Sequence, residues 1–94
     1  MPVTLFELFR TPTQVKIIEE LLKRPMEYFT ISRMAKIIDA SPSAVSAKVI
    51  SLEKLGLIRF VGGSEKAKIF YLNRDSQLVK ILIDFFNRIS RYDP

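Results

Sequence analysis

The sequence predicts a mainly α-helical domain with a small β-hairpin, a fold of the α+β class. Three observations support this prediction: apolar residues recur at helical spacing, Ser or Thr followed by Pro begins two of these segments, and the spacing becomes extended after Gly56. The chain has 94 residues, 48% of them apolar, which is enough for one domain with its own core.

Two helices are predicted near the start of the chain. Thr4 and Glu7 have the spacing of a capping box and favour a short helix. Thr11 and Pro12 then provide the N-cap and first residue of a longer helix that reaches about residue 24. In that helix Gln14 takes the position of a capping-box glutamine.

Two further helices are separated by a very short turn. Thr30 can cap a helix over residues 31–38, and Ser41 with Pro42 can begin another that ends near residue 55. Residues 39–41 between them are too few for anything but a tight turn. The second helix has an apolar stripe that we expect to face inward, formed by Val45, Val49, Leu52 and Leu55. Two short helices joined in this way make a helix-turn-helix.

The chain after this helix favours strands. Gly56 can take the left-handed conformation that ends a helix. Residues 57–61 and 67–72 then favour the strands of a hairpin with a glycine-containing loop, and residues 27–29 are also extended in character. The order helix, helix, turn, helix and hairpin is typical of a winged helix-turn-helix, with the hairpin as the wing.

Parts of this region resemble a known family. Residues 30–35, 41–46 and, above all, the Leu-Glu-Lys-Leu-Gly-Leu-Ile run at 52–58 resemble the DNA-binding domains of MarR-like and ArsR-like regulators. The resemblance covers about two thirds of the chain and implies a transcriptional regulator that binds double-stranded DNA. The absence of Cys and the abundance of Lys and Ile are similar to small regulators of archaea or their viruses.

The charge distribution agrees with a polyanionic partner. The net charge is +5, and residues 33–68 carry seven basic against three acidic residues, hence +4 of it. We expect the helix at 42–55 to lie in the major groove and the wing at 61–68 to contact the backbone or minor groove. The expected DNA contacts are Arg33, Lys36, Ser41, Ser43, Ala44, Ser46, Ala47, Lys48, Ile50, Lys54, Lys66 and Lys68. Two alternatives stay open, because Ser41 could serve only as a cap and the wing lysines could serve only solubility.

The outward edge of the helix at 42–55 predicts limited base recognition. It offers no Arg, Asn or Gln, the residues that form bidentate bonds with guanine or adenine. Most of the binding energy should therefore come from phosphates. Four phosphate contacts in each subunit of a dimer predict a slope of about −7 for log K against log salt concentration.

A last helix is predicted over residues 76–92 and carries two apolar stripes. We expect one stripe to pack on the domain core, namely Leu78, Leu82, Phe85, Ile89 and Tyr92. The other should bury itself against a second subunit, giving an interface of Leu5, Phe6, Phe9, Val79, Ile83 and Phe86. Residues 1–94 would then be a single domain, with 11–73 as its core and 1–10 and 75–92 as dimerisation segments. The alternative is that all these residues fold onto the monomer core.

Other classes of function have little support. The carboxylates of Glu19, Glu20, Asp39 and Asp84 are scattered, and the glycines form neither a Walker loop nor a dinucleotide motif, so we expect no enzyme. Without Cys or His we expect no metal site and no cofactor, and without a long apolar run we expect a cytoplasmic protein. Whether a small-molecule effector binds stays open. The alternative function is a winged-helix protein-interaction module of the transcription or replication machinery.

Overall fold

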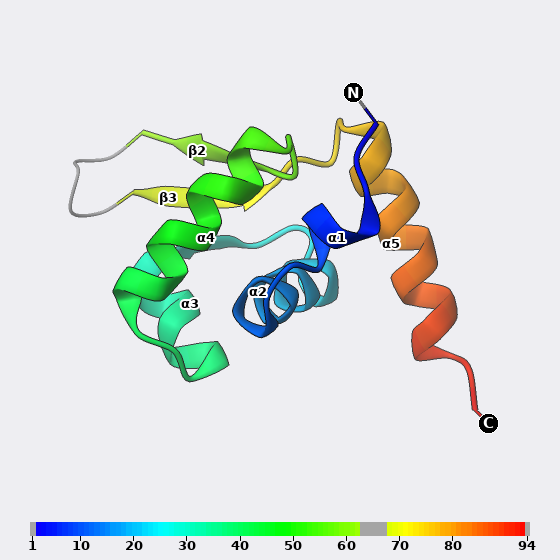
Figure 1. Ribbon diagram of the computed structural model, residues 1–94, viewed down its shortest axis with the longest axis horizontal. Coiled ribbons are helices and arrows are strands. Elements are labelled where there is room, and N and C mark those ends of the chain that lie inside the picture. The colour runs from blue at the N-terminus through cyan, green and yellow to red at the C-terminus, as the bar shows by residue number, and fades with distance from the viewer. Residues whose placement is uncertain (1, 63–67, 94) are drawn as a thin grey trace.

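The computed structural model describes residues 2–62 and 68–93, and within them lie five helices and three strands. In chain order they are α1 (Leu5–Leu8), α2 (Pro12–Lys23), β1 (Tyr28–Thr30), α3 (Ile31–Ile38), α4 (Pro42–Lys54), β2 (Ile58–Val61), β3 (Ile69–Leu72) and α5 (Gln77–Ser90). Figure 1 shows α4 lying across α2 and α3, with the hairpin of β2 and β3 extending at one end of the molecule and α5 at the other. The predicted order of elements is confirmed.

Local hydrogen bonds begin the two helices of the helix-turn-helix where the sequence predicts. The Thr30 hydroxyl accepts a backbone N–H of the first turn of α3 at 3.1 Å, and the Ser41 hydroxyl does the same for α4 at 3.2 Å. α3 ends at Asp39, whose φ of 56° is left-handed. A short polar side chain tolerates this conformation better than most, so the tight turn needs no glycine.

Gly56 ends α4 and turns the chain into the wing. Its φ is +79°, and the N–H of Leu57 donates to the carbonyl of Leu52 at 3.0 Å. This bond satisfies one of the carbonyls that the end of a helix leaves free. A side chain at this φ would be strained, which explains why glycine stands between the helix and the wing.

The hairpin belongs to a three-stranded antiparallel sheet. β2 pairs with β3 as predicted, and β1 pairs with the other edge of β3, so the strand order is β1-β3-β2. Phe29, Phe70 and Phe60 lie in one cross-strand row, with ring centroids 6.0 Å apart for the first pair and 6.3 Å for the second. Such aromatic pairs stabilise neighbouring strands. The extended segment at 27–29 was predicted, but its pairing with β3 was not.

One hydrophobic core joins the helices to the sheet. From α4, Val45, Val49 and Leu52 have no exposed surface, and Leu55 packs half-buried at the edge of the core. The predicted inward stripe of this helix is therefore confirmed. The other buried apolar residues are Leu8, Ile17, Ile18, Leu21, Leu22, Phe29, Met34, Ala35, Ile38, Leu57, Ile58, Phe70, Leu72, Val79 and Leu82.

Gln14 is a buried polar residue that holds α1 against α2. Its backbone N–H donates to the Thr11 hydroxyl at 3.2 Å, which confirms the predicted N-cap. Its side-chain amide instead donates to the carbonyls of Glu7 and Leu8, at 2.7 and 2.8 Å. The capping-box role predicted for this side chain is not seen, because among the described residues no hydrogen bond runs from the Thr11 backbone N–H to the Gln14 amide oxygen, and the amide nitrogen instead binds the end of α1.

Gln14→Leu should therefore destabilise the domain. The substitution keeps most of the volume but leaves two carbonyl groups without their donor, at a cost of about 1–3 kcal/mol. Urea denaturation followed by circular dichroism measures the free energy of unfolding. Gln77→Leu, at an exposed position on α5, is the matched control and should change it by less than about 0.5 kcal/mol. Equal stability of the two variants would contradict the role of Gln14.

Candidate nucleic-acid interface

The side of α4 that faces away from the core is open to solvent. Ser43, Ala47, Ile50 and Lys54 are exposed, while Ala44, Ser46 and Lys48 lie half-buried on the flanks. The side chains in its first half are short, so a partner can approach the helix backbone closely. This edge has the shape and length that a recognition helix needs in the major groove of DNA.

Ser41 has a structural task at the start of α4. Its hydroxyl accepts the N–H of Ala44 at 3.2 Å and lies 3.3 Å from the hydroxyl of Ser43. These contacts support the alternative that the sequence left open, in which Ser41 serves as the cap. Ser43 is exposed directly beside it and remains available to a partner.

One wing lysine is placed by the structure. Lys68 is exposed just before β3, and its ammonium lies 5.5 Å from the ring centroid of Phe60 on β2. This cation–π contact holds the charge against the hairpin. Lys66, the other wing lysine expected to contact DNA, lies outside the described residues.

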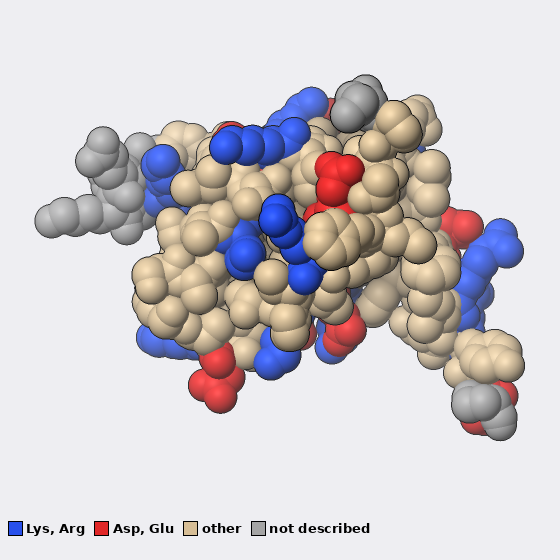
Figure 2. Space-filling view, in the orientation of Figure 1, with Lys and Arg blue, Asp and Glu red and all other residues tan. Residues whose placement is uncertain are grey.

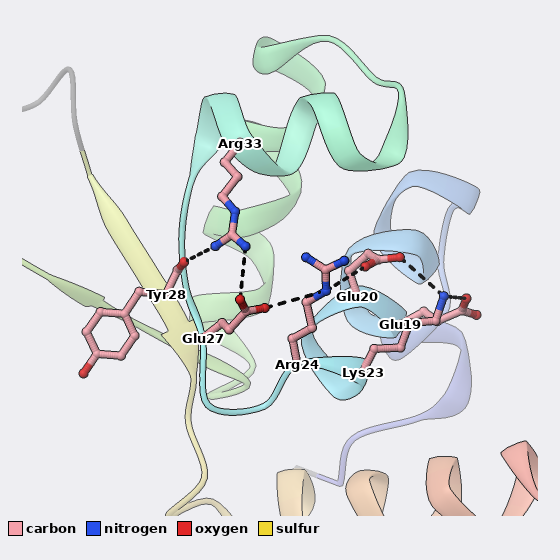
Figure 3. Close-up of polar contacts among 7 residues, drawn as sticks. All are labelled: Glu19, Glu20, Lys23, Arg24, Glu27, Tyr28 and Arg33. Carbon is pink, nitrogen blue, oxygen red and sulfur yellow. Dashed lines mark hydrogen bonds and ion pairs between the residues drawn. The ribbon is translucent and has the colours of Figure 1, made fainter.

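Arg33 is bound within the domain, as Figure 3 shows. Its guanidinium donates to the carbonyl of Tyr28 at 2.7 Å and to the carboxylate of Glu27 at 3.2 Å. It also lies 4.6 Å from the ring centroid of Phe29. These contacts favour a structural role for Arg33, because Glu27 balances its charge and β1 takes one of its donors, while the contact with a phosphate stays a prediction.

The same figure shows that this ion pair continues into a chain of charges on α2. Arg24 lies between Glu27 and Glu20, at 3.6 and 4.0 Å, and Lys23 lies 3.3 Å from Glu19. The hydrogen bond with Glu19, together with the charge of Glu20, raises the pKa of Lys23 above its ordinary value. These cations are paired on the surface of the domain and are not free for DNA.

A second group of cations lies in a groove between α4 and the turn that joins α1 to α2. The groove has a volume of about 170 Å³ and is lined by Arg10, Lys48, Lys54, Glu7, Gln14, Ser51 and Leu55. Figure 2 shows basic side chains gathered over α4 and between α4 and α1 on this face. The structure thus brings Lys48 and Lys54 together, as a DNA interface requires, and adds Arg10, which the sequence analysis missed. Lys36 is exposed on α3.

The two faces of α5 differ in part from those expected: Leu78 and Leu82 pack on the core as predicted, whereas Phe85, Ile89 and Tyr92 are exposed. Val79 and Leu82 are buried in the core of the same subunit, and Ile83 and Phe86 pack half-buried against that core. The assignment of Val79 to a dimer interface is therefore wrong, because Val79 has no exposed surface. The assignment of the half-buried Ile83 and Phe86 stays a prediction. The exposed apolar residues of α5 are Ile81, Phe85, Ile89 and, just beyond the helix, Tyr92.

Next to this exposed face lies an apolar groove between α2 and α5. It has a volume of about 170 Å³ and is lined by Phe9, Val15, Ile18, Glu19, Leu22, Leu82, Phe85, Phe86 and Ile89. Leu5 and Phe6 of α1 are also largely exposed. Exposed apolar residues in such number on one small domain mark a contact surface.

Two other kinds of site find no support in the described part of the chain. Residues 2–62 and 68–93 hold no group of three or more Asp, Glu, Cys or His side chains placed to bind a metal ion. Among the described helices, none combines the length and the apolar character needed to cross a membrane.

Comparison with known proteins identifies the fold. HlyU from Vibrio cholerae in its reduced form superimposes with a TM-score of 0.71 at 19% identity, over 94% of this chain and 86% of HlyU. MepR, a transcription regulator from Staphylococcus aureus, gives 0.64 at 21% over 86% of this chain, and the adhesin competence repressor AdcR from Streptococcus pyogenes gives 0.64 at 22% over 85%. The matches span 61% of MepR and 57% of AdcR. No family model and no curated protein matches the sequence.

The domain therefore has the winged helix-turn-helix fold. α3 and α4 are its helix-turn-helix, and β2 with β3 forms its wing, as the sequence predicts. This confirms the fold implied by the resemblance to MarR-like and ArsR-like regulators.

The different roles of two cations on α3 can be tested by substitution. Arg33→Gln removes a hydrogen bond to β1 and a contact with Phe29, and should lower the free energy of unfolding by about 1 kcal/mol after allowance for solvent screening. Lys36→Gln, on the same helix, removes an exposed charge and should change it by less than about 0.5 kcal/mol. Urea denaturation of both variants provides the measurement. A greater loss for Lys36→Gln would contradict the assignment.

Proposed function

We propose that this protein is a homodimeric transcriptional regulator that binds double-stranded DNA, with α4 in the major groove and the wing on the backbone or in the minor groove. The observation that carries the proposal is the outward edge of α4, which is open to solvent and lies beside the cations Lys48 and Lys54. The likeness of fold to the regulator MepR and the repressor AdcR supports it.

Phosphate contacts supply most of the binding energy in this proposal. Lys36, Lys48, Lys54 and Lys68 are the described lysines of α3, α4 and the wing that are expected to contact the backbone. Base recognition is left to the hydroxyls of Ser43 and Ser46 and to contacts of Ala47 and Ile50 with thymine methyl groups. The protein should thus bind many sequences with moderate affinity and prefer some of them modestly.

Dimerisation buries the exposed apolar face of α5 in this proposal. Ile81, Phe85, Ile89 and Tyr92, together with Leu5 and Phe6, are the residues that a second subunit would cover. A two-fold axis through this face would present two recognition helices to successive major grooves, roughly 34 Å apart. The binding site would then be a pseudo-palindrome.

No catalysis is needed for this function. The carboxylates of Glu19, Glu20 and Asp84 form ion pairs with neighbouring Lys or Arg on helix surfaces. The proposed molecule acts by occupying DNA.

Ser46→Glu should weaken the DNA complex strongly. The new carboxylate would face the negatively charged groove, and we expect at least about a hundredfold loss of affinity from repulsion and lost contact. Electrophoretic mobility shift on random and genomic duplexes measures it. Gln77→Glu introduces the same group at an exposed position on α5 and should leave affinity within about twofold.

Two results would count against the proposed interface. Unchanged affinity of the Ser46→Glu variant would remove α4 from contact with DNA. Failure of the unmodified protein to bind any duplex at low salt would instead favour the second function considered from the sequence, a protein-interaction module.

Phe85→Glu should convert the dimer into a monomer. Phe85 is about half exposed (52%) on the apolar face of α5, so a charge there costs little in the monomer but opposes burial between subunits. Sedimentation equilibrium measures the mass of the particle. Lys80→Glu, at an exposed polar position on the same helix, should remain dimeric. A Phe85→Glu protein that is still dimeric would place the subunit contact elsewhere.

A further inference from the structure

The groove between α4 and the α1–α2 turn concentrates positive charge without balancing it. Arg10, Lys48 and Lys54 all line this one groove, and Glu7 is the single carboxylate among its lining residues. The Glu7 carboxylate is also the acceptor of a hydrogen bond from the Thr4 hydroxyl at 3.2 Å. Because three positive charges and one negative charge line the same groove, the groove favours an anion.

The three cations of the groove have no carboxylate partner in the described part of the chain. Within residues 2–62 and 68–93, Arg10, Lys48 and Lys54 form neither an ion pair nor a hydrogen bond through their charged groups. In contrast, Arg24, Arg33, Arg59, Arg88 and Lys23 are each paired with a carboxylate. Some other described cations, such as Lys16, Lys36 and Lys80, also have no ion pair, but the groove is lined by three unpaired cations and one carboxylate.

The neutral polar groups of the groove have other partners. The Gln14 amide donates to two carbonyls at the end of α1, and the Ser51 hydroxyl donates to the carbonyl of Ala47 at 3.3 Å. The guanidinium of Arg10 lies 5.7 Å from the ring centroid of Phe6, which limits where it can point. An anion in the groove would therefore be held by the three cations.

We infer that this groove binds a phosphodiester group of the DNA backbone, and that Arg10 and the α1–α2 turn belong to the DNA interface. The inference rests on the proposed function and extends it to an element outside the helix-turn-helix and the wing. Lys54 lies both on the outward edge of α4 and in the groove. A duplex in contact with that edge would thus carry its backbone over Arg10.

The salt dependence of binding tests this inference. A fifth phosphate contact in each subunit of a dimer steepens the slope of log K against log salt concentration from about −7 to about −9. Arg10→Gln should return the slope to about −7 and weaken binding tens of fold at about 0.1 M salt. Arg10→Lys, which keeps the charge, should retain a slope near that of the unmodified protein.

The matched control is Arg91→Gln, which removes an exposed arginine just beyond α5 and should leave the slope unchanged. Fluorescence anisotropy with a duplex that the unmodified protein binds, between about 50 and 200 mM salt, gives the slopes. Urea denaturation verifies that each variant folds. An Arg10→Gln protein that is folded and keeps the full slope would overturn the inference.

The inference and the proposed function can fail separately. If Ser46→Glu abolishes binding while Arg10→Gln has no effect, the function stands and the groove is not part of the interface. If the unmodified protein binds no duplex, both fail. A further experiment adds inorganic phosphate at constant ionic strength and measures the melting temperature. Phosphate could raise the melting temperature of the unmodified protein but not that of Arg10→Gln, while both proteins give equal slopes on DNA. In that case the groove binds a free phosphate group and the inference is overturned.

Discussion

The inward packing of α4 is the constraint on which the rest of the molecule depends. Val45, Val49 and Leu52 have no exposed surface, and burial of each aliphatic side chain contributes roughly 1.5–3 kcal/mol. Because an α-helix has 3.6 residues per turn, the residues opposite these three, such as Ser43, Ala47 and Ile50, must face outward. The surface offered to DNA is therefore a direct consequence of the core.

The fold could be predicted wherever a local signal decides it. A capping hydroxyl before Pro42, and a glycine able to take a positive φ at position 56, define the two ends of α4 from a few neighbouring residues. The pairing of β1 with β3 could not be predicted in this way. β1 has only three residues, which is too short a pattern to predict which strand it pairs with. The Phe29–Phe70 contact also joins positions about forty residues apart in the chain.

The site was predictable to the extent that it follows from helical spacing. A charge in a sequence does not reveal its partner, so Arg33 was taken for a free cation although Glu27 and β1 bind it. The two apolar stripes of α5 have the same helical spacing. Spacing alone therefore does not predict that the stripe with Val79 is the buried one. Arg10 precedes an N-cap and belongs to no periodic segment, so only the structure brings it to the groove.

The short helix α1 has a thermodynamic consequence. Its exposed Phe6 belongs to the proposed subunit contact and lies against Arg10, while the Gln14 amide ties the end of α1 to α2. If dimerisation raises the affinity for DNA by some factor, then binding of the duplex must raise the affinity between subunits by the same factor, because such coupling is reciprocal. Assembly and occupancy of the operator would then rise and fall together through a helix of only four residues.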